Sequence, residues 1–341
     1  MTSFDLSGLG WSDHFARQLN GASPDTAARV TTVHRDRLSV LSPAGALTIL
    51  PDGPTSDYAV GDWVLHDGTQ VVKLLDRKSL IQRRAAGEVA RSQLVAANVD
   101  TLGIVTSCNA DFNPSRLMRY LILAANADAI PLVILTKADL VDDDRRYRRE
   151  AESLSPLVTA LTLNAKDPQD VERLTPWCRG GQTLVLVGSS GVGKTTLQNV
   201  LTGQIEATQG IREDDAKGRH TTTARHLRPT LHGGWLIDTP GMRELGLTDV
   251  ADGIAEVFAD VEALATECKF RDCAHEGEPG CAVQAAIDRG DLDASRLAEW
   301  RKLKREDEIS TQSVADARAR DRTRQKMYNE GKKRSRNKRG D

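Results

Sequence analysis

A short glycine-rich segment, Gly188–Thr195, has the residue types that bind phosphate groups. It matches the pattern G-x-x-x-x-G-K-[ST] and lies between an apolar run expected as a strand, Thr183–Val187, and a helical segment, Thr196–Leu201. Glycines let main-chain N–H groups converge on phosphate oxygens, and the lysine adds a mobile positive charge. The segment therefore predicts a nucleoside-triphosphate site. Its predicted contacts are Ser189, Ser190, Gly191, Val192, Gly193, Lys194, Thr195 and Thr196.

One hydroxyl group and one carboxylate group are spaced to hold the Mg²⁺ ion of such a nucleotide. The hydroxyl of Thr195 directly follows the lysine, and Asp238 ends the apolar run 236–238. Both supply the oxygen ligands that Mg²⁺ prefers. Gly241, three residues after Asp238, lets a main-chain N–H reach the terminal phosphate. We therefore predict that Thr195 and Asp238 ligate magnesium and that Asp238 and Gly241 contact the nucleotide.

The predicted base-recognition residues follow two other strands. Thr136, Lys137 and Asp139 form a Thr-Lys-x-Asp motif, matching the [NT]-K-x-D signature of guanine-binding sites. A carboxylate accepts from both N1–H and the N2 amino group of guanine, whereas adenine offers no such pair. After a second strand, Asn164 and Ala165 stand where the main-chain N–H of Ala165 can reach guanine O6. Together with the phosphate loop, these residues favour GTP over ATP.

The order of these motifs is informative. In Ras-like GTPases the phosphate loop comes first and the base-recognition loops last, but here residues 136–139 and 164–166 precede residues 188–195. The packing of a sheet does not depend on where the chain is cut, provided that the cut lies in an exposed loop. The sequence therefore predicts a circularly permuted domain.

A first switch loop is expected at residues 218–223, between the phosphate-loop helix and a predicted hairpin. We predict that Thr222 completes the Mg²⁺ shell, with Thr221 and Thr223 as close alternatives. His220 is the predicted catalytic residue, because it could orient the attacking water from this loop; a surface histidine without such a role is the alternative. Met242 stands where Ras-type enzymes carry a water-orienting glutamine, and a thioether cannot do this work. Hydrolysis is therefore predicted to be slow without a partner.

A second kind of site is predicted near the C-terminus. Three thiols and one imidazole fall within fourteen residues, and the chain has five cysteines in all. Four soft or borderline ligands with no open position suit a structural Zn²⁺ ion. Unpaired cysteines that bind metal also favour a reducing compartment, here the cytoplasm. The predicted ligands are Cys268, Cys273, His275 and Cys281.

Changes in the pattern of apolar and polar residues along the chain predict a multidomain architecture. Short strands and turns suggest a small β-barrel of the OB type over 30–88, although any small antiparallel β module has the same signal. Alternating strands and helices predict an α/β P-loop GTPase domain over 89–250. A mainly helical zinc-binding domain is expected over 251–317. The remaining segments are a flexible extension, 1–29, and a basic tail, 318–341.

Composition limits the classes of partner. The 341 residues carry a net charge of −2, but the tail alone carries +8, which leaves an acidic body. A basic tail suggests a polyanionic partner, with RNA the first candidate, or else a solubilising tail. No run approaches the roughly 20 apolar residues of a membrane span, and no secretory signal is expected in residues 1–11. Nothing suggests an obligate oligomer, so a monomer is expected.

These motifs, in this order, resemble the RsgA family of circularly permuted GTPases, which depend on the small ribosomal subunit. Further matching stretches are 85–87 and 96–100. The resemblance implies an N-terminal OB-fold, a permuted GTPase domain and a zinc domain. It also implies a late-acting assembly factor that binds the 30S subunit and its 16S rRNA, hydrolyses GTP faster there, and is then released. The switch-loop histidine of that family assists hydrolysis, which supports the prediction for His220.

Two other functions remain open at this stage. One is a nucleotide-dependent rRNA-binding module in which hydrolysis is incidental; it would bind RNA equally with GDP and GTP. The other is a small-molecule kinase, against which the Thr136–Asp139 motif argues because it disfavours ATP.

Overall fold

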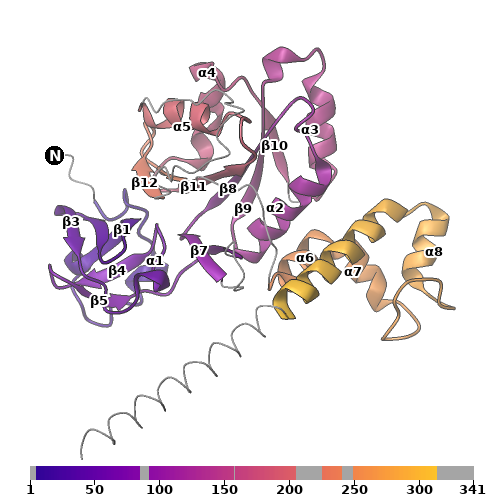
Figure 1. The fold of residues 1–341 in the computed structure, drawn as a ribbon, viewed down its shortest axis with the longest axis horizontal. Coiled ribbons are helices and arrows are strands. Elements are labelled where there is room, and N and C mark those ends of the chain that lie inside the picture. The colour runs from indigo at the N-terminus through magenta and orange to yellow at the C-terminus, as the bar shows by residue number, and fades with distance from the viewer. Residues whose placement is uncertain (1–4, 85–91, 157, 205–224, 240–248, 313–341) are drawn as a thin grey trace, which may run out of the picture.

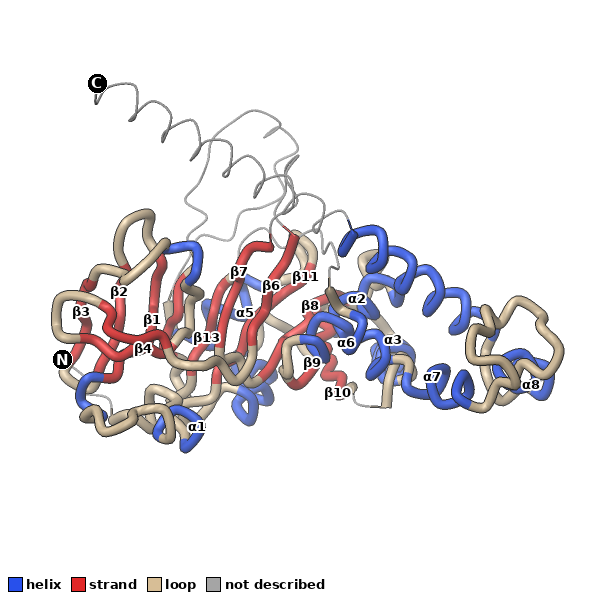
Figure 2. Tube along the Cα trace, turned by 90° about the horizontal axis from the view of Figure 1, so that it is seen from below, coloured by secondary structure: helices blue, strands red, loops and turns tan. Residues whose placement is uncertain are grey.

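The structure is a computed structural model that describes residues 5–84, 92–156, 158–204, 225–239 and 249–312. A small β-barrel, a central sheet covered by helices and a group of C-terminal helices follow one another along the molecule (Figures 1 and 2). The predicted boundary at residue 88, His220, Thr222, Gly241 and the tail 318–341 lie outside the described residues.

The N-terminal part is an antiparallel sheet in the order β3-β2-β1-β4-β5. Its strands are β1 (Ala27–Val33), β2 (Leu38–Ser42), β3 (Gly45–Ile49), β4 (Trp63–His66) and β5 (Val71–Leu74), with one-turn helices at Pro24–Thr26 and Thr55–Asp57. Alternate residues of β2 are buried, as expected for strands with one face on a core. A bridge between Leu50 and Gln70 joins the two outer strands, which closes the sheet. This OB-like sheet confirms the predicted β-barrel.

The segment before the barrel differs from the predicted loose extension. Leu9 and Phe15, the latter in α1 (Asp13–Ala16), are fully buried. The rings of Trp11 and Trp63 make a T-shaped contact with a centroid distance of 4.8 Å. Trp235 of the central sheet donates from its indole nitrogen to the carbonyl of Gly8 over 2.8 Å. These contacts gain their free energy from a few large side chains, which have no periodicity that a sequence pattern would reveal.

A two-stranded hairpin connects the barrel to the central sheet. It comprises β6 (Leu80–Arg84) and β7 (Ser92–Ala97). The central sheet has six strands in the order β10-β9-β8-β11-β13-β12, parallel except for β12. Its strands are β8 (Thr101–Ser107), β9 (Ile130–Thr136), β10 (Thr159–Thr162), β11 (Thr183–Gly188), β12 (His226–Pro229) and β13 (Trp235–Asp238).

Helices cover both faces of this sheet. Because side chains alternate along a strand, Val185 and Val187 face one core and Leu184 and Leu186 face the other. The first core includes residues of α2 (Pro114–Asn126) and α3 (Asp144–Glu152), and the second includes residues of α4 (Pro168–Val171) and α5 (Lys194–Thr202). A one-turn 3₁₀ helix occupies Ala138–Leu140, and a two-turn 3₁₀ helix occupies Glu172–Trp177. The predicted α/β domain is therefore present, with the expected alternation of strands and helices.

The C-terminal part is helical, as predicted. It contains α6 (Ala251–Val257), α7 (Ala259–Thr266), α8 (Ala282–Arg289) and a helix over residues 294–312. A Cβ at Gly253 would lie 2.5 Å from the carbonyl oxygen of Ile122, so only glycine allows α6 to pack this closely on α2. Leu297, Trp300 and Leu303 of the last helix are buried in the same core as α2.

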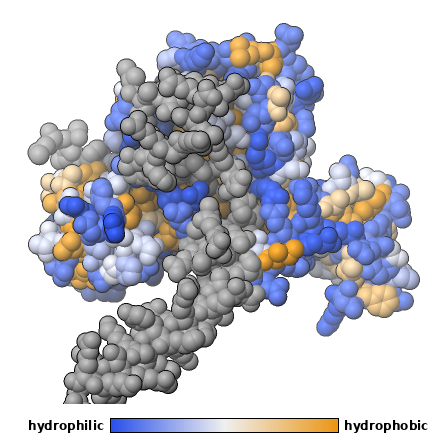
Figure 3. Space-filling model, in the orientation of Figure 1, coloured by the Kyte–Doolittle hydropathy of each residue, from blue (hydrophilic) through white to orange (hydrophobic). Residues whose placement is uncertain are grey.

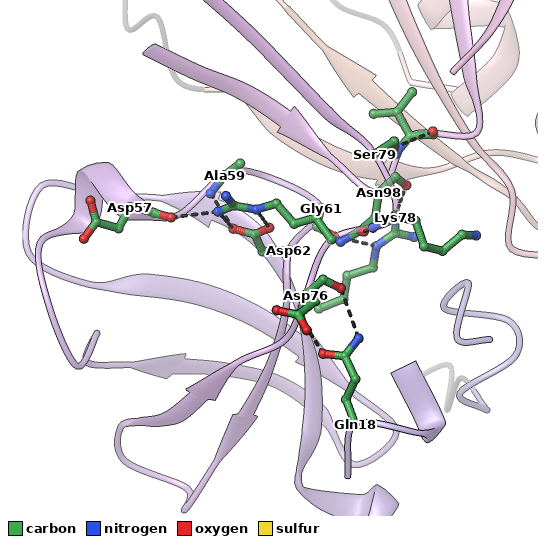
Figure 4. A network of polar contacts seen from close by, with 12 residues as sticks. Gln18, Asp57, Ala59, Gly61, Asp62, Asp76, Lys78, Ser79 and Asn98 are labelled. Carbon is green, nitrogen blue, oxygen red and sulfur yellow. Dashed lines mark hydrogen bonds and ion pairs between the residues drawn. The ribbon is translucent and has the colours of Figure 1, made fainter. Parts of the chain in front are cut away.

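Polar contacts fix the junction between barrel and sheet. The side-chain amide of Asn98 donates to the carbonyl of Gly61 over 3.0 Å, and its oxygen accepts from the main chain of Lys78 (Figure 4). Nearby, the guanidinium of Arg77 pairs with both carboxylate oxygens of buried Asp62, at 2.6 and 2.8 Å. Pairing of these buried polar groups favours one relative position of the two parts.

On the face shown in Figure 3, hydrophobic residues gather in small separate groups within a mostly hydrophilic surface. Within the residues that the structure describes, no helix is both long and apolar enough to cross a membrane.

Candidate functional site

The carboxyl ends of the parallel strands bring the predicted nucleotide residues to one edge of the central sheet. The base-recognition loops follow β9 and β10, the phosphate loop follows β11, and Asp238 ends β13. Ligands of open α/β sheets bind at this edge. The residues that the sequence predicts, as far as they are described, therefore lie together.

The phosphate loop runs from the buried end of β11 into the first turn of α5. Val192 is buried, and Gly193 precedes the helix with φ of +100°, a value that L side chains rarely adopt. The loop therefore presents its main chain, rather than side chains, at the start of a helix. Converging main-chain N–H groups and the helix dipole both favour an anion at such a place.

Lys194 and Thr195 open helix α5, and both are half-buried. The ammonium group of Lys194 donates to the main-chain carbonyl of Gly188 over 2.9 Å and to that of Ser189. Its charge is therefore already held against the phosphate loop. This arrangement suits an ammonium group that binds phosphate oxygens held by the loop.

Thr136 joins the base-recognition motif to the phosphate loop. Its side chain is fully buried, and its hydroxyl lies 2.5 Å from the carbonyl oxygen of Val192 and 3.1 Å from that of Thr106. The hydroxyl is therefore directed at the phosphate loop and at the neighbouring strand. The sequence pattern placed Thr136 among the binding residues, and the geometry assigns its side chain to positioning the phosphate loop.

The rest of the base-recognition motif turns outward. Lys137 has a left-handed backbone, with φ of +60°, and Asp139 is exposed in the one-turn helix that follows. Such a backbone is uncommon for a residue other than glycine and redirects the chain sharply after β9. The Asp139 carboxylate is thus available at the edge of the sheet. Lys137 is half-buried beside it.

The second base-recognition loop packs beside the first. The side-chain oxygen of Asn164 accepts from the main-chain N–H of Lys166 over 3.0 Å. The main-chain N–H of Asn164 donates to the Asp170 carboxylate over 2.6 Å. Ala165 is buried, and its Cβ lies 3.7 Å from where a side chain at Gly193 would begin. The two predicted recognition loops and the phosphate loop therefore converge. Asp170 was not found from the sequence, because an acidic residue in a first helical turn is common.

Asp238 lies one strand away from the phosphate loop. It pairs in register with Leu186 of β11 and with His226 of β12. The next residue, Thr239, is fully buried and donates its hydroxyl to the Leu186 carbonyl over 2.8 Å. This bond fixes the direction in which the chain leaves β13. The arrangement places a carboxylate beside the strand that enters the phosphate loop.

The four predicted metal ligands come together before and at the start of α8. Nδ1 of His275 lies 3.5 Å from Sγ of Cys268 and 3.5 Å from Sγ of Cys281, and the two sulfurs are 3.9 Å apart. With Cys273 included, all four ligand atoms lie within 4.8 Å of one another. Ligands of a tetrahedral ion with bonds of about 2.0–2.3 Å lie about 3.3–3.8 Å apart. The cluster could therefore bind a metal ion.

Two residues that the sequence did not single out support this cluster. The carboxylate of Glu278 accepts from the main-chain N–H groups of Ala274 and Glu276 at 2.8 and 2.7 Å. Its pKa is lowered to about 2, first by its own main-chain N–H and then by these two donors. Gln284 donates from its side-chain amide to the carbonyl of His275. In the sequence, the only sign of this support is that Glu278 lies between two predicted ligands, His275 and Cys281, and that sign is weak.

Comparison with known proteins agrees with this geometry. The model of the RsgA GTPase family matches residues 74–248. A protein of Mesorhizobium japonicum named small ribosomal subunit biogenesis GTPase RsgA is 51% identical, over 91% of this chain and 92% of its own length. Small ribosomal subunit biogenesis GTPase RsgA 2 of Vibrio parahaemolyticus is 48% identical, over 94% of this chain and 91% of its own.

Two solved structures share the fold. YjeQ from Thermotoga maritima superposes with a TM-score of 0.61 and 26% identity, over 82% of this chain and 96% of that one. YloQ, described as a circularly permuted GTPase, superposes with a TM-score of 0.57 and 21% identity, over 85% and 95%. The permuted order of motifs predicted from the sequence is therefore the order of a known fold.

Proposed function

The chain belongs to the RsgA GTPase family, and from that premise we propose that it is a factor of small ribosomal subunit biogenesis that hydrolyses GTP slowly alone and faster on the 30S subunit. Hydrolysis would be coupled to release from the subunit late in its maturation. The observation that carries the proposal is the contact of Thr136 with Val192, which joins a guanine-recognition motif to a phosphate loop. The names of the similar proteins support the choice of the small subunit.

The proposed nucleotide contacts follow from the sheet edge. Main-chain N–H groups of the loop 188–195 and the Lys194 ammonium would bind the phosphates, and Asp139 would accept from the guanine ring. The main chain of Ala165 would reach guanine O6. Thr195 and Asp238 would supply the oxygen ligands that suit Mg²⁺, and the ion would offset the negative charge of the phosphates. Thr222 and Gly241 remain predictions from the sequence alone.

Slow unaided hydrolysis is proposed because the position after the Asp-x-x-Gly motif is Met242, which cannot orient water by hydrogen bonding. His220 is the proposed water-orienting residue, and a partner would complete its placement. Electrostatic and positional completion of such a site by a partner accelerates GTP hydrolysis by about 10³–10⁵-fold in other GTPases. The same range bounds the effect expected here.

The metal cluster is proposed to hold one structural Zn²⁺ ion. Three sulfurs and one nitrogen suit zinc better than the oxygen-binding ions, and the three distances among Cys268, His275 and Cys281 are close to the edges of a tetrahedron. The four side chains supply four ligands, and four complete the shell of a structural zinc ion. The ion would therefore stabilise the loop before α8 and take no part in hydrolysis.

The partner is proposed to be the 30S subunit, contacted through its 16S rRNA, by a monomeric protein in the cytoplasm. The tail 318–341 carries a net charge of +8 and would contact rRNA phosphates. Deleting it should weaken binding to 30S subunits and flatten the dependence of binding on salt. If the salt dependence of 30S binding is unchanged by the deletion, the tail does not contact the subunit.

The experiment that tests the function is steady-state phosphate release from GTP and from ATP, each with and without purified 30S subunits. We expect slow turnover of GTP, strong acceleration by the subunits and no turnover of ATP. Lys194→Met should abolish turnover, whereas Lys302→Met, at an exposed lysine of the last helix, should not change it. If 30S subunits do not change the turnover of GTP, and the protein binds RNA equally well with GDP and with GTP, the RNA-binding module with incidental hydrolysis is favoured.

A further inference from the structure

One polar contact joins the barrel to the strand that follows the predicted first switch segment. Oγ1 of Thr32, in β1, lies 2.9 Å from Nδ1 of His226, the first residue of β12. Thr32 is only 6% exposed, and His226 is half-buried. The two residues are 194 positions apart in the chain. Their contact therefore depends on the packing of the barrel against the central sheet.

The neighbouring residue is held in a similar way. Arg225 donates from its guanidinium to the main-chain carbonyl of Leu94, in β7, over 3.3 Å. Burial, and then the nearby charge of Arg83, lower the pKa of Arg225. β1 and β12 also contact each other directly, side by side in Figure 1. The first two described residues after segment 205–224 are thus attached to elements on the N-terminal side of the chain.

On its other side, His226 lies next to the proposed Mg²⁺ carboxylate. It pairs with Asp238 across the β12–β13 ladder, and Asp238 pairs with Leu186, two residues before the end of β11. Residues 221–225 alone separate His226 from His220 in the sequence. A displacement of His226 would therefore act on Asp238 across the ladder.

On the barrel side, β1 leads from Thr32 into an exposed turn. The turn covers residues 34–37, closed by a bond from the His34 N–H to the Arg37 carbonyl over 2.9 Å, and Arg35 and Arg37 are exposed on it. Exposed arginines suit a phosphate backbone. A nucleic acid bound at this turn would act on the same strand that contacts His226.

We propose that Thr32 is a positioning residue for GTP hydrolysis, through which rRNA bound to the barrel acts on β12 and, across the β12–β13 ladder, on Asp238. The proposal rests on the proposed function, since it requires that the 30S subunit accelerates hydrolysis. Because β1 and His226 are bonded, a partner that shifts β1 shifts the strand after the switch segment with it. A single hydrogen bond contributes about 1 kcal/mol, so its loss corresponds to about a fivefold loss of acceleration.

The test compares Thr32→Val with a matched variant one residue earlier. Thr31→Val also removes a threonine hydroxyl from β1, but that hydroxyl donates to the carbonyl of Ser39 within the barrel. We expect Thr32→Val to leave unaided turnover and the KM for 30S subunits within twofold of the wild type, and to lower the subunit-stimulated kcat about fivefold. Thr31→Val and Thr32→Ser, which keeps the hydroxyl, should behave as the wild type.

A double-mutant cycle keeps the result specific to the contact. His226→Ala should lower the stimulated kcat about as much as Thr32→Val, and the double variant should be no worse than either. If 30S subunits stimulate turnover equally in the wild type and in Thr32→Val, the positioning role is overturned and the proposed function stays intact. An equal fall of unaided and stimulated turnover would overturn it as well, because it would indicate a structural effect alone. A wild-type protein that 30S subunits do not stimulate would overturn both proposals.

Discussion

The Thr136 hydroxyl and the Val192 carbonyl oxygen lie 2.5 Å apart, 56 residues apart in the chain, at the centre of the proposed nucleotide site. This bond connects the strand that carries the Thr-Lys-x-Asp motif to the loop that precedes α5. Since Thr136 is fully buried, the bond is shielded from water and holds the loop in one position. The bond therefore links the proposed base-recognition motif to the proposed phosphate loop.

Thr136→Val should weaken the binding of GTP and GDP by about 5–30-fold. The substitution keeps the shape of the side chain but leaves the carbonyl of Val192 without its partner, at a cost of about 1–2 kcal/mol. Fluorescent nucleotide titration measures the change. Thr106→Val is the matched control, because the Thr106 hydroxyl is buried in the neighbouring strand but bonds to Asp111 at 3.3 Å. Equal affinities in the two variants would show that the contact does not hold the loop.

Asp139→Asn should change the preferred base from guanine to xanthine. Loss of the carboxylate removes two bonds from guanine N–H groups, each about 1.5–3 kcal/mol, so GTP binding should fall about a hundredfold or more. The new amide can donate to the oxygen that xanthine carries at position 2. Competition between GTP and xanthosine triphosphate measures the preference. Asp142→Asn, at an exposed carboxylate nearby, should leave it unchanged.

The site was largely predictable because its residues directly follow buried strands. The apolar runs before Thr136 and Gly188 are both complete strands, and parallel strands bring their carboxyl ends to one edge. The sequence could not reveal what a buried hydroxyl bonds to. The pattern therefore predicts that Thr136 lies at the carboxyl end of a strand, as it does, whereas its bond to Val192 depends on tertiary packing.

Parts of the fold depend on contacts between distant segments, and these were not predictable. Leu9 and Phe15 lie in a short polar stretch without a period of 2 or 3.6, so no pattern marks them as buried. Arg29 is charged but only 1% exposed, which reverses the usual expectation for arginine. In each case the partner lies in another part of the chain, and composition alone cannot identify it.

Thiol titration should distinguish the metal ligands from the other cysteines. Burial raises the pKa of Cys108 and of Cys178 to about 11, so both stay protonated and shielded near pH 8. The metal-loaded protein should therefore react slowly at all five cysteines. After removal of the metal by a chelator, Cys268, Cys273 and Cys281 should react, and the remaining two only after unfolding. Rapid reaction of three thiols in protein shown to contain zinc would argue against the proposed ligand set.

Arg29→Met should destabilise the junction between barrel and sheet by about 3 kcal/mol or more. The Arg29 guanidinium donates to the carbonyls of Leu9 and Asn98 and to the Thr183 hydroxyl, at 2.7, 3.2 and 2.7 Å. Burial lowers its pKa to about 10, so it stays charged at neutral pH, and its removal leaves buried acceptors without a donor. Urea unfolding measures the loss. Arg37→Met, with a side chain 56% exposed, should change stability by less than about 0.5 kcal/mol. A similar small effect for both variants would mean that the barrel does not depend on Arg29 for its attachment.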